Sequence, residues 1–234
     1  MDYTAQTLPE AGLGESRIAF IRSTYSYLAV ALLAFTVLSG ILYASGVGVA
    51  LLKLMSASKF VWIGFLGVFM LVGWFASSWA DNAESNQKQM IGLGIYVLAE
   101  ALIFSPLFAI AAAVAPKAIP AAGFITLLLV AGLTYTAFST KKDFSFLGGI
   151  LKIAGFCAIG AIIASVIFGF SLGIWFSAIM VVFAGGCVLY DTSNIIHHYP
   201  TDRPAGAALH LFASIALMLW YVLRILISLT SSDD

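Results

Sequence analysis

The sequence is poor in charge and in the residues that build catalytic or metal centres. Only 9% of its 234 residues are charged, and it contains three histidines and two cysteines. An ordinary soluble domain carries about 25% charged residues. The 11 basic and 11 acidic residues balance, and no basic patch interleaved with aromatic residues is present. Nucleic-acid binding is therefore not expected.

The few reactive residues form no known catalytic or metal-binding motif. Cys157 and Cys187 lie in apolar runs without CxxC spacing, which predicts buried small apolar side chains. The chain has no GxSxG, HExxH or GxxxxGKS/T motif. His210 and Ser214 are one helical turn apart, but nothing marks the oxyanion hole that a Ser–His pair needs. We expect no enzymatic activity, no bound metal and no cofactor.

Long apolar segments are what the sequence has in abundance. Hydrophobic residues make up 62% of the chain, and the mean hydropathy is +1.03. A helix needs about 20 residues to cross a hydrocarbon core of about 30 Å. The pattern predicts an all-α, polytopic membrane protein with seven spans. They lie near Tyr25–Ser45, Phe60–Ala80, Gln89–Ala115, Ala118–Ser139, Phe146–Phe170, Leu172–Ile196 and Gly206–Thr230.

The connectors are short, so the sequence predicts one seven-helix membrane domain, residues 25–230. Residues 1–24 are polar and are interpreted as a cytoplasmic tail, and residues 231–234 as a C-terminal tail. The first apolar run is longer than the apolar core of a signal peptide, so we interpret it as a span that stays attached. Val47–Ser58 is either a loop or a short helix in the membrane interface.

Five ionisable residues fall within the predicted spans. Such groups cost roughly 2.5–3.5 kcal/mol at a helix centre on insertion scales, so each should have a partner or reach water. At a rise of about 1.5 Å per residue, Asp191, Lys152 and His210 share a layer near the inner face. Glu100 is predicted near mid-membrane with an interior partner, and Arg224 nearer the outer face.

Each of these residues has more than one interpretation. Lys152 and Arg224 can extend their long side chains to the headgroups. His210 is either a neutral, hydrogen-bonded residue or, with an ordinary pKa of about 6.5, a group that responds to cytoplasmic pH. Asp191 either belongs to a polar helix end facing water or faces the bundle interior as a cation ligand or proton-sensitive switch.

Two stretches resemble motifs of the Bax inhibitor family. They are KKDFSFLGGIL (Lys141–Leu151) and LYDTSNIIHH (Leu189–His198). With seven spans, a polar N-terminus and a sparse C-terminal tail, the whole chain resembles this family, and most of all its bacterial YccA-like branch. The resemblance implies a protein of the bacterial inner membrane, in contact with lipid, whose last helix is surrounded by the other six.

The resemblance also implies two activities. Some bacterial members are pH-sensitive calcium leaks, gated by one aspartate on the sixth span and one on the seventh. YccA-like members instead interact with the membrane-bound AAA protease FtsH, beside HflK and HflC, as modulators or poor substrates. In this sequence Asp191 matches the first aspartate, whereas Ser214 stands at the position of the second.

The missing second aspartate separates the two activities. Two close carboxylates can share a proton because repulsion raises one pKa, and a single carboxylate cannot act as that latch. The leading prediction is therefore an FtsH modulator or substrate, with the polar N-terminal segment as the handle that the protease grips. The alternative is a calcium or cation leak with Asp191 at the cytoplasmic mouth, assisted by His210, Ser214, Lys152 or Glu100.

Positive charge predicts the orientation of the chain. Basic residues near the span ends favour the cytoplasmic side. The side that includes the N-terminus carries Arg17, Arg22, Lys88, Lys141, Lys142 and Arg203, whereas the other side carries Lys53, Lys59 and Lys117.

We predict that the N-terminus is cytoplasmic and that the C-terminus lies across the membrane. Reporter fusions placed before Arg17 and after Asp234 measure this directly, because alkaline phosphatase is active only outside the cytoplasm and green fluorescent protein only inside. Finding both ends on the same side would contradict the seven-span topology.

Overall fold

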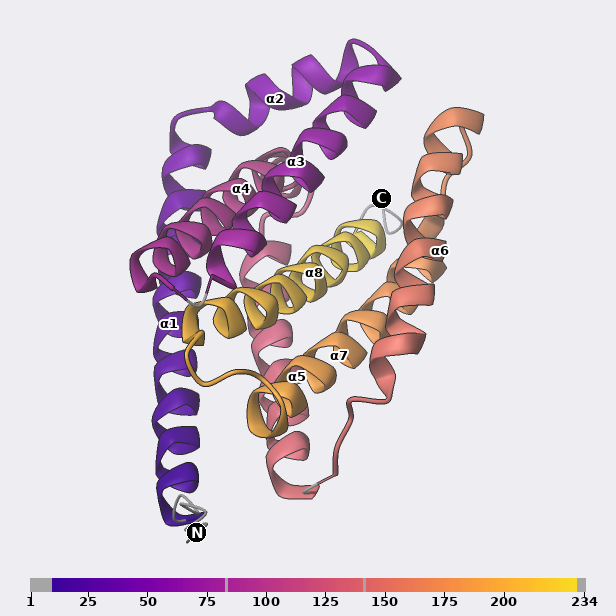
Figure 1. Ribbon diagram of the computed structural model, residues 1–234. Coiled ribbons are helices and arrows are strands. Elements are labelled where there is room, and N and C mark those ends of the chain that lie inside the picture. Colours follow the sequence, from indigo (N-terminus) through magenta and orange to yellow (C-terminus); the bar gives the residue numbers. More distant parts are fainter. Residues whose placement is uncertain (1–9, 83, 141, 231–234) are drawn as a thin grey trace, which may run out of the picture.

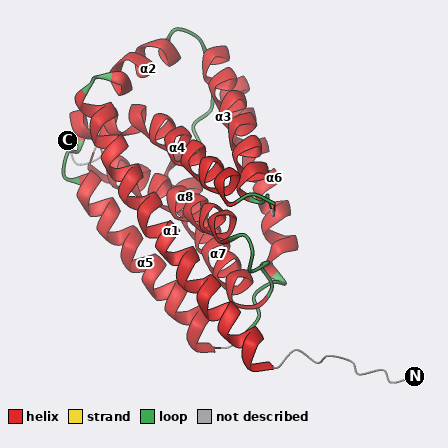
Figure 2. Ribbon diagram, turned by 60° about the vertical axis from the view of Figure 1, so that its left-hand side comes forward, coloured by secondary structure: helices red, strands yellow, loops and turns green. Residues whose placement is uncertain are grey.

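A computed structural model describes residues 10–82, 84–140 and 142–230, and these residues fold into helices joined by short loops (Figure 2). No β-strand occurs in these ranges. Seven of the helices are long and apolar enough to cross a membrane, which confirms the predicted all-α, seven-span fold. The helices are α1 (Glu10–Ala44), α2 (Val47–Ser56), α3 (Lys59–Ala80), α4 (Asn86–Val114), α5 (Ala118–Thr140), α6 (Leu147–Phe168), α7 (Gly173–His197) and α8 (Pro204–Thr230).

Helix α1 begins much earlier than the predicted first span. The polar residues before Tyr25 suggested a tail, but the helix runs from Glu10, and Gly14–Ala44 has the length and apolarity of a span. Phe20 and Thr24 are buried, one turn apart on the face that packs against the bundle. The predicted tail is corrected accordingly: residues 14–24 are part of a packed helix. Residues 1–9 and 231–234 lie outside the described residues.

The segment after α1 is a helix rather than a loop. Helix α2 lies across one end of the bundle (Figure 1). Gly46 links α1 to α2 with φ of +75°, a left-handed backbone conformation that glycine adopts without strain. Helix α2 packs on α4 and α3. This placement fits the interfacial-helix alternative that the sequence left open.

Helix α8 is central, as predicted. Helices α1, α3, α4, α5 and α7 pack against it, and its side chains Leu209, Phe212 and Leu223 are fully buried. Helix α6 is the one span that does not touch α8. It packs only on α7 and α3, and none of its residues is buried. Cys157 on α6 is consequently exposed, not buried as predicted.

The helices alternate in direction and give the bundle two ends. The inner end consists of the start of α1 and the α3–α4, α5–α6 and α7–α8 loops, and it is the end predicted to face the cytoplasm. The outer end consists of α2, the α4–α5 and α6–α7 turns and the end of α8.

Close approach of α3 and α4 requires glycine at position 92. A Cβ atom at Gly92 would lie 2.5 Å from the carbonyl oxygen of Ala76 and 2.5 Å from the amide nitrogen of Ala80. At Gly94, on the same helix, a Cβ would meet nothing within 4 Å.

We predict that Gly92→Ala destabilises the protein by about 1–3 kcal/mol, because the added methyl group overpacks the helix contact. The midpoint of thermal unfolding in detergent measures the loss. Gly94→Ala is the matched control and should keep or slightly raise that midpoint, since alanine favours the helix. Equal midpoints for the two variants would contradict the tight α3–α4 contact.

Candidate functional site at the inner end

The two stretches that carry the family resemblance contact each other at the inner end. His198 Nε2 lies 2.6 Å from Asp143 Oδ2. The backbone N–H of Phe144 donates to Ser193 Oγ at 2.9 Å, and the Ser193 hydroxyl donates to Asp143 Oδ1 at 3.3 Å. The hydrogen bond from His198 holds the pKa of the Asp143 carboxyl well below its usual range. These contacts fix the α5–α6 loop against the end of α7.

A second histidine–carboxylate pair joins three further segments. Asp81, at the end of α3, accepts a hydrogen bond from the Tyr199 hydroxyl, and its Oδ2 lies 3.1 Å from His210 Nε2. Burial raises the pKa of Asp81, but hydrogen bonds from His210 and Tyr199 and the positive charges of His210 and Arg203 outweigh it, so the pKa is lowered. Burial and the neighbouring Asp81 raise the pKa of Tyr199, which keeps its phenol a donor.

Two more side chains tie the α7–α8 loop to the bundle. Arg17 of α1 donates to the carbonyl oxygen of Tyr199 at 2.5 Å. The buried Gln89 of α4 donates through Nε2 to the carbonyl oxygens of Asn82 at 3.0 Å and Asp202 at 2.9 Å. The α7–α8 loop is thereby held by α1, by the α3–α4 loop and by α4.

Asp191 points to α8, at the position that the family resemblance singles out. The Ser214 hydroxyl donates to Asp191 Oδ2 at 2.5 Å. Ser214 therefore contacts the carboxylate of α7 from the place where the resemblance expects a second aspartate. Ser214 bonds to Asp191 and His210 to Asp81, so the one-turn spacing of His210 and Ser214 does not form a Ser–His pair.

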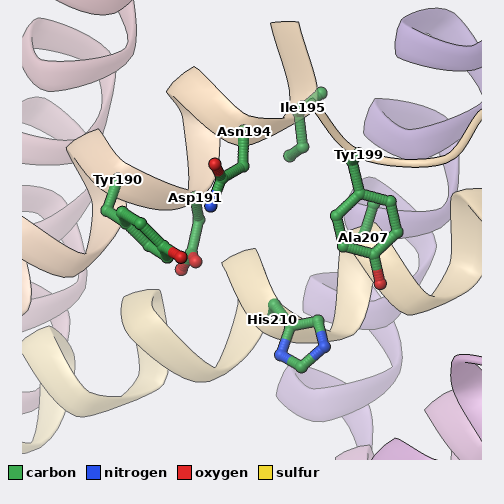
Figure 3. Close-up of a pocket in the computed structure, with 7 residues that line it drawn as sticks. All are labelled: Tyr190, Asp191, Asn194, Ile195, Tyr199, Ala207 and His210. Carbon is green, nitrogen blue, oxygen red and sulfur yellow. The ribbon is translucent and has the colours of Figure 1, made fainter. Parts of the chain in front are cut away.

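Asp191 and His210 line a common cavity at the inner end, the inner cavity (Figure 3). Its volume is about 190 Å³, far above the roughly 10–15 Å³ that one water molecule needs. In Figure 3 the Asp191 carboxylate projects from α7 toward α8, and the His210 ring projects from α8. The cavity is lined by Tyr190, Asp191, Asn194, Ile195, Tyr199, Ala207 and His210.

A much larger cavity, the outer cavity, opens on the other side of Ser214. Its volume is about 1140 Å³, and its walls come from α2, α3, α4, α6, α7 and α8. Ser214 and Glu100 line it, and so does Arg224 nearer the outer end. Asp191 lines the inner cavity and Ser214 the outer one, so the hydrogen bond between them stands between the two cavities.

The structure brings together three of the five predicted site residues. Asp191, His210 and Ser214 meet at the inner end. Glu100 is buried on α4, and the group that interacts with it, which the sequence did not reveal, is Tyr96 one turn earlier. Lys152 lies outside the site: it is exposed on α6, which stands away from α8.

Seven apolar spans around a polar inner end define a polytopic helical membrane protein, and comparison with known sequences supplies its family. The family model described as Inhibitor of apoptosis-promoting Bax1 matches residues 17–231. The chain therefore belongs to the Bax inhibitor family.

Relatives come from bacteria, fungi and plants. An uncharacterized protein of Campylobacter jejuni is 31% identical over 88% of this chain and 87% of its own length. Bax inhibitor 1 of Schizosaccharomyces pombe is 28% identical over 100% of this chain and 86% of its own. Protein LIFEGUARD 4 of Arabidopsis thaliana is 29% identical over 86% and 81%.

We predict that Asp81→Asn lowers the stability by about 1 kcal/mol, the size of a partly exposed, charge-assisted hydrogen bond. The lowered pKa of Asp81 means that its carboxylate stabilises the fold above its ordinary value of 3.8, and that this contribution disappears as the pH falls through the lower folded value. Thermal unfolding at several pH values measures the effect. The difference in unfolding midpoint between wild type and Asp81→Asn should be largest at about pH 5 and should decrease toward about pH 3.

Glu84→Gln is the control for this experiment, since Glu84 is an exposed carboxylate in the same α3–α4 loop. It should leave the midpoint unchanged at every pH. If Asp81→Asn behaves like Glu84→Gln at about pH 5, the Asp81 cluster does not stabilise the inner end.

Proposed function

We propose that this protein is a pH-sensitive cation leak, closed where Ser214 donates its hydrogen bond to Asp191. The observation that supports this proposal best is the position of that bond. Asp191 lines the inner cavity, Ser214 lines the outer cavity, and the bond joins the two residues. A hydrogen bond to a charged group contributes only about 1.5–3 kcal/mol net, so thermal motion can break and remake it.

The chemistry of the inner cavity suits a divalent cation in passage. Ca²⁺ binds carboxylate, carbonyl and water oxygens. Asp191 supplies a carboxylate and Asn194 an amide oxygen, and the volume leaves room for water. One carboxylate and one amide are too few for a permanent calcium site, which takes about 6–8 oxygen ligands. Such a set favours brief binding and release.

The pH dependence of the proposed leak comes from His210. Its neighbours are the carboxylate of Asp81, the phenol of Tyr199 and the carboxylate of Asp191, with Arg203 further along the loop. A protonated His210 attracts both carboxylates and holds α8 to the inner loops. Loss of that proton as the pH rises weakens the attraction. The leak should therefore increase as the pH rises from about 6 to about 8.

The FtsH-partner function, which led at the level of sequence, has less support. Its predicted handle was the segment Met1–Arg22, interpreted as a flexible tail. Residues 14–22 belong to α1, and Arg17 is hydrogen-bonded to the α7–α8 loop. Interaction with FtsH, HflK and HflC stays a proposal, and purification of the protein from membranes followed by detection of FtsH tests it.

We predict that purified protein in liposomes releases calcium faster at about pH 8 than at about pH 6. Ser214→Ala should raise the flux about tenfold or more, because at least about 1.5 kcal/mol of closing interaction is lost. Asp191→Asn should abolish most of the flux by removing the cation ligand. His210→Ala should leave flux but remove most of its pH dependence. A calcium-sensitive dye inside the vesicles measures the flux through wild type and through each of the three variants.

Cys157→Ala, an exposed site on α6, is the neutral control and should match wild type. If His210→Ala retains the wild-type pH profile, His210 has no gating role. If wild type shows no flux at any pH, the leak proposal fails and the FtsH-partner proposal stands alone.

A further inference from the structure

One face of the central helix α8 is not covered by protein. Helix α6 does not contact α8, and the outer cavity of about 1140 Å³ occupies the space that remains. This volume exceeds the roughly 300–1,000 Å³ of common ligand pockets. The lining is mostly apolar and includes Trp62, Leu66, Phe104, Ile163, Leu217 and Trp220.

Such an apolar space requires an occupant in a bilayer. An empty cavity forfeits dispersion contacts along its whole lining, and water in it would meet few polar partners. Hydrocarbon is the solvent around α6, whose side chains Phe156, Ile163 and Phe168 are exposed. A lipid acyl chain can therefore fill the space without any loss of apolar contact.

Arg224 supplies a charge at the outer part of this cavity. It is exposed on α8 and lines the cavity. Among the described residues, no carboxylate forms an ion pair with Arg224. It lies six residues before the helix end at Thr230, or about 9 Å, a depth from which an arginine reaches the headgroup layer. A guanidinium binds two phosphate oxygens at once through a pair of parallel N–H···O hydrogen bonds, a bidentate arrangement.

We propose that the outer cavity is a binding site for one anionic phospholipid. An acyl chain lies between α3, α6 and α8, and the phosphate is bound by Arg224. This inference does not depend on the leak, because it concerns binding alone. If the leak exists, a chain in this position also fills the outer end of its route, since the same cavity reaches Ser214.

The test is native mass spectrometry of the purified protein in mild detergent, titrated with phosphatidylglycerol or with phosphatidylcholine. Wild type should bind one phosphatidylglycerol saturably and about tenfold more tightly than phosphatidylcholine, because both lipids carry the phosphate but the choline ammonium of phosphatidylcholine repels the Arg224 guanidinium. Arg224→Gln should lose that preference. Gly67→Leu should weaken binding of both lipids, because Gly67 lines the cavity and has open space beside it.

Two matched controls separate this site from general effects. Lys152→Gln removes a different exposed cation of the membrane domain. Gly64→Leu adds the same bulk as Gly67→Leu at a glycine of α3 that also has open space beside it but does not line the cavity. Both should bind like wild type. Equal binding of the two lipids to wild type, loss of preference in Lys152→Gln, or non-saturating binding of many lipids would overturn the proposal. If the protein is observed as a dimer without lipid, the cavity is filled by a second copy of the chain. If it is observed as a monomer without lipid, the cavity needs no occupant.

Discussion

The inner end of the bundle depends on the cost of placing a carboxylate among membrane helices. Asp191 lies within α7, and one of its carboxylate oxygens accepts a hydrogen bond from the hydroxyl of Ser214 on α8. This bond joins the central helix to α7, between a residue of the inner cavity and a residue of the outer cavity. Without it, Asp191 would keep the longer-range attraction of His210, whose Nε2 lies 3.1 Å from Asp81 Oδ2. In the proposed leak, the bond from Ser214 to Asp191 is the closing contact, and His210, bonded to Asp81, is the group that responds to pH.

Lipid as the solvent explains the rest of the architecture. Where helices carry polar groups, they pack closely and pair them, as α7 and α8 do. Where a helix is almost entirely apolar, nothing forces it against the protein, and α6 stands apart with no buried residue. The same property that leaves α6 uncovered creates the outer cavity. The proposed lipid site and the proposed closure at Ser214 thus both follow from one uneven distribution of polarity.

Hydropathy alone predicts the seven spans, because their apolar runs match the bilayer thickness. It fails at the start of α1, where Arg17 and other polar residues look like a tail although Phe20 and Thr24 repeat at helical spacing and pack inward. Depth along a helix correctly places Asp191 and His210 at one end. It also places Lys152 there, since depth carries no information about which helices are neighbours. The pairing of His210 with Asp81, 129 residues apart, leaves no local pattern in the sequence.

The central claim, a water-filled inner cavity that ends at the Asp191–Ser214 bond, is tested most directly by thiol accessibility. In a background where alanine replaces Cys157 and Cys187, single cysteines are placed at Asn194, which lines the inner cavity, and at Leu217, which lines the outer cavity one turn beyond Ser214, so that the Asp191–Ser214 bond is kept. A membrane-impermeant thiol reagent is then added from the side of the α7–α8 loop. We predict rapid labelling of Asn194→Cys and much slower labelling of Leu217→Cys at about pH 6. Equal labelling of both, or of neither, would contradict it.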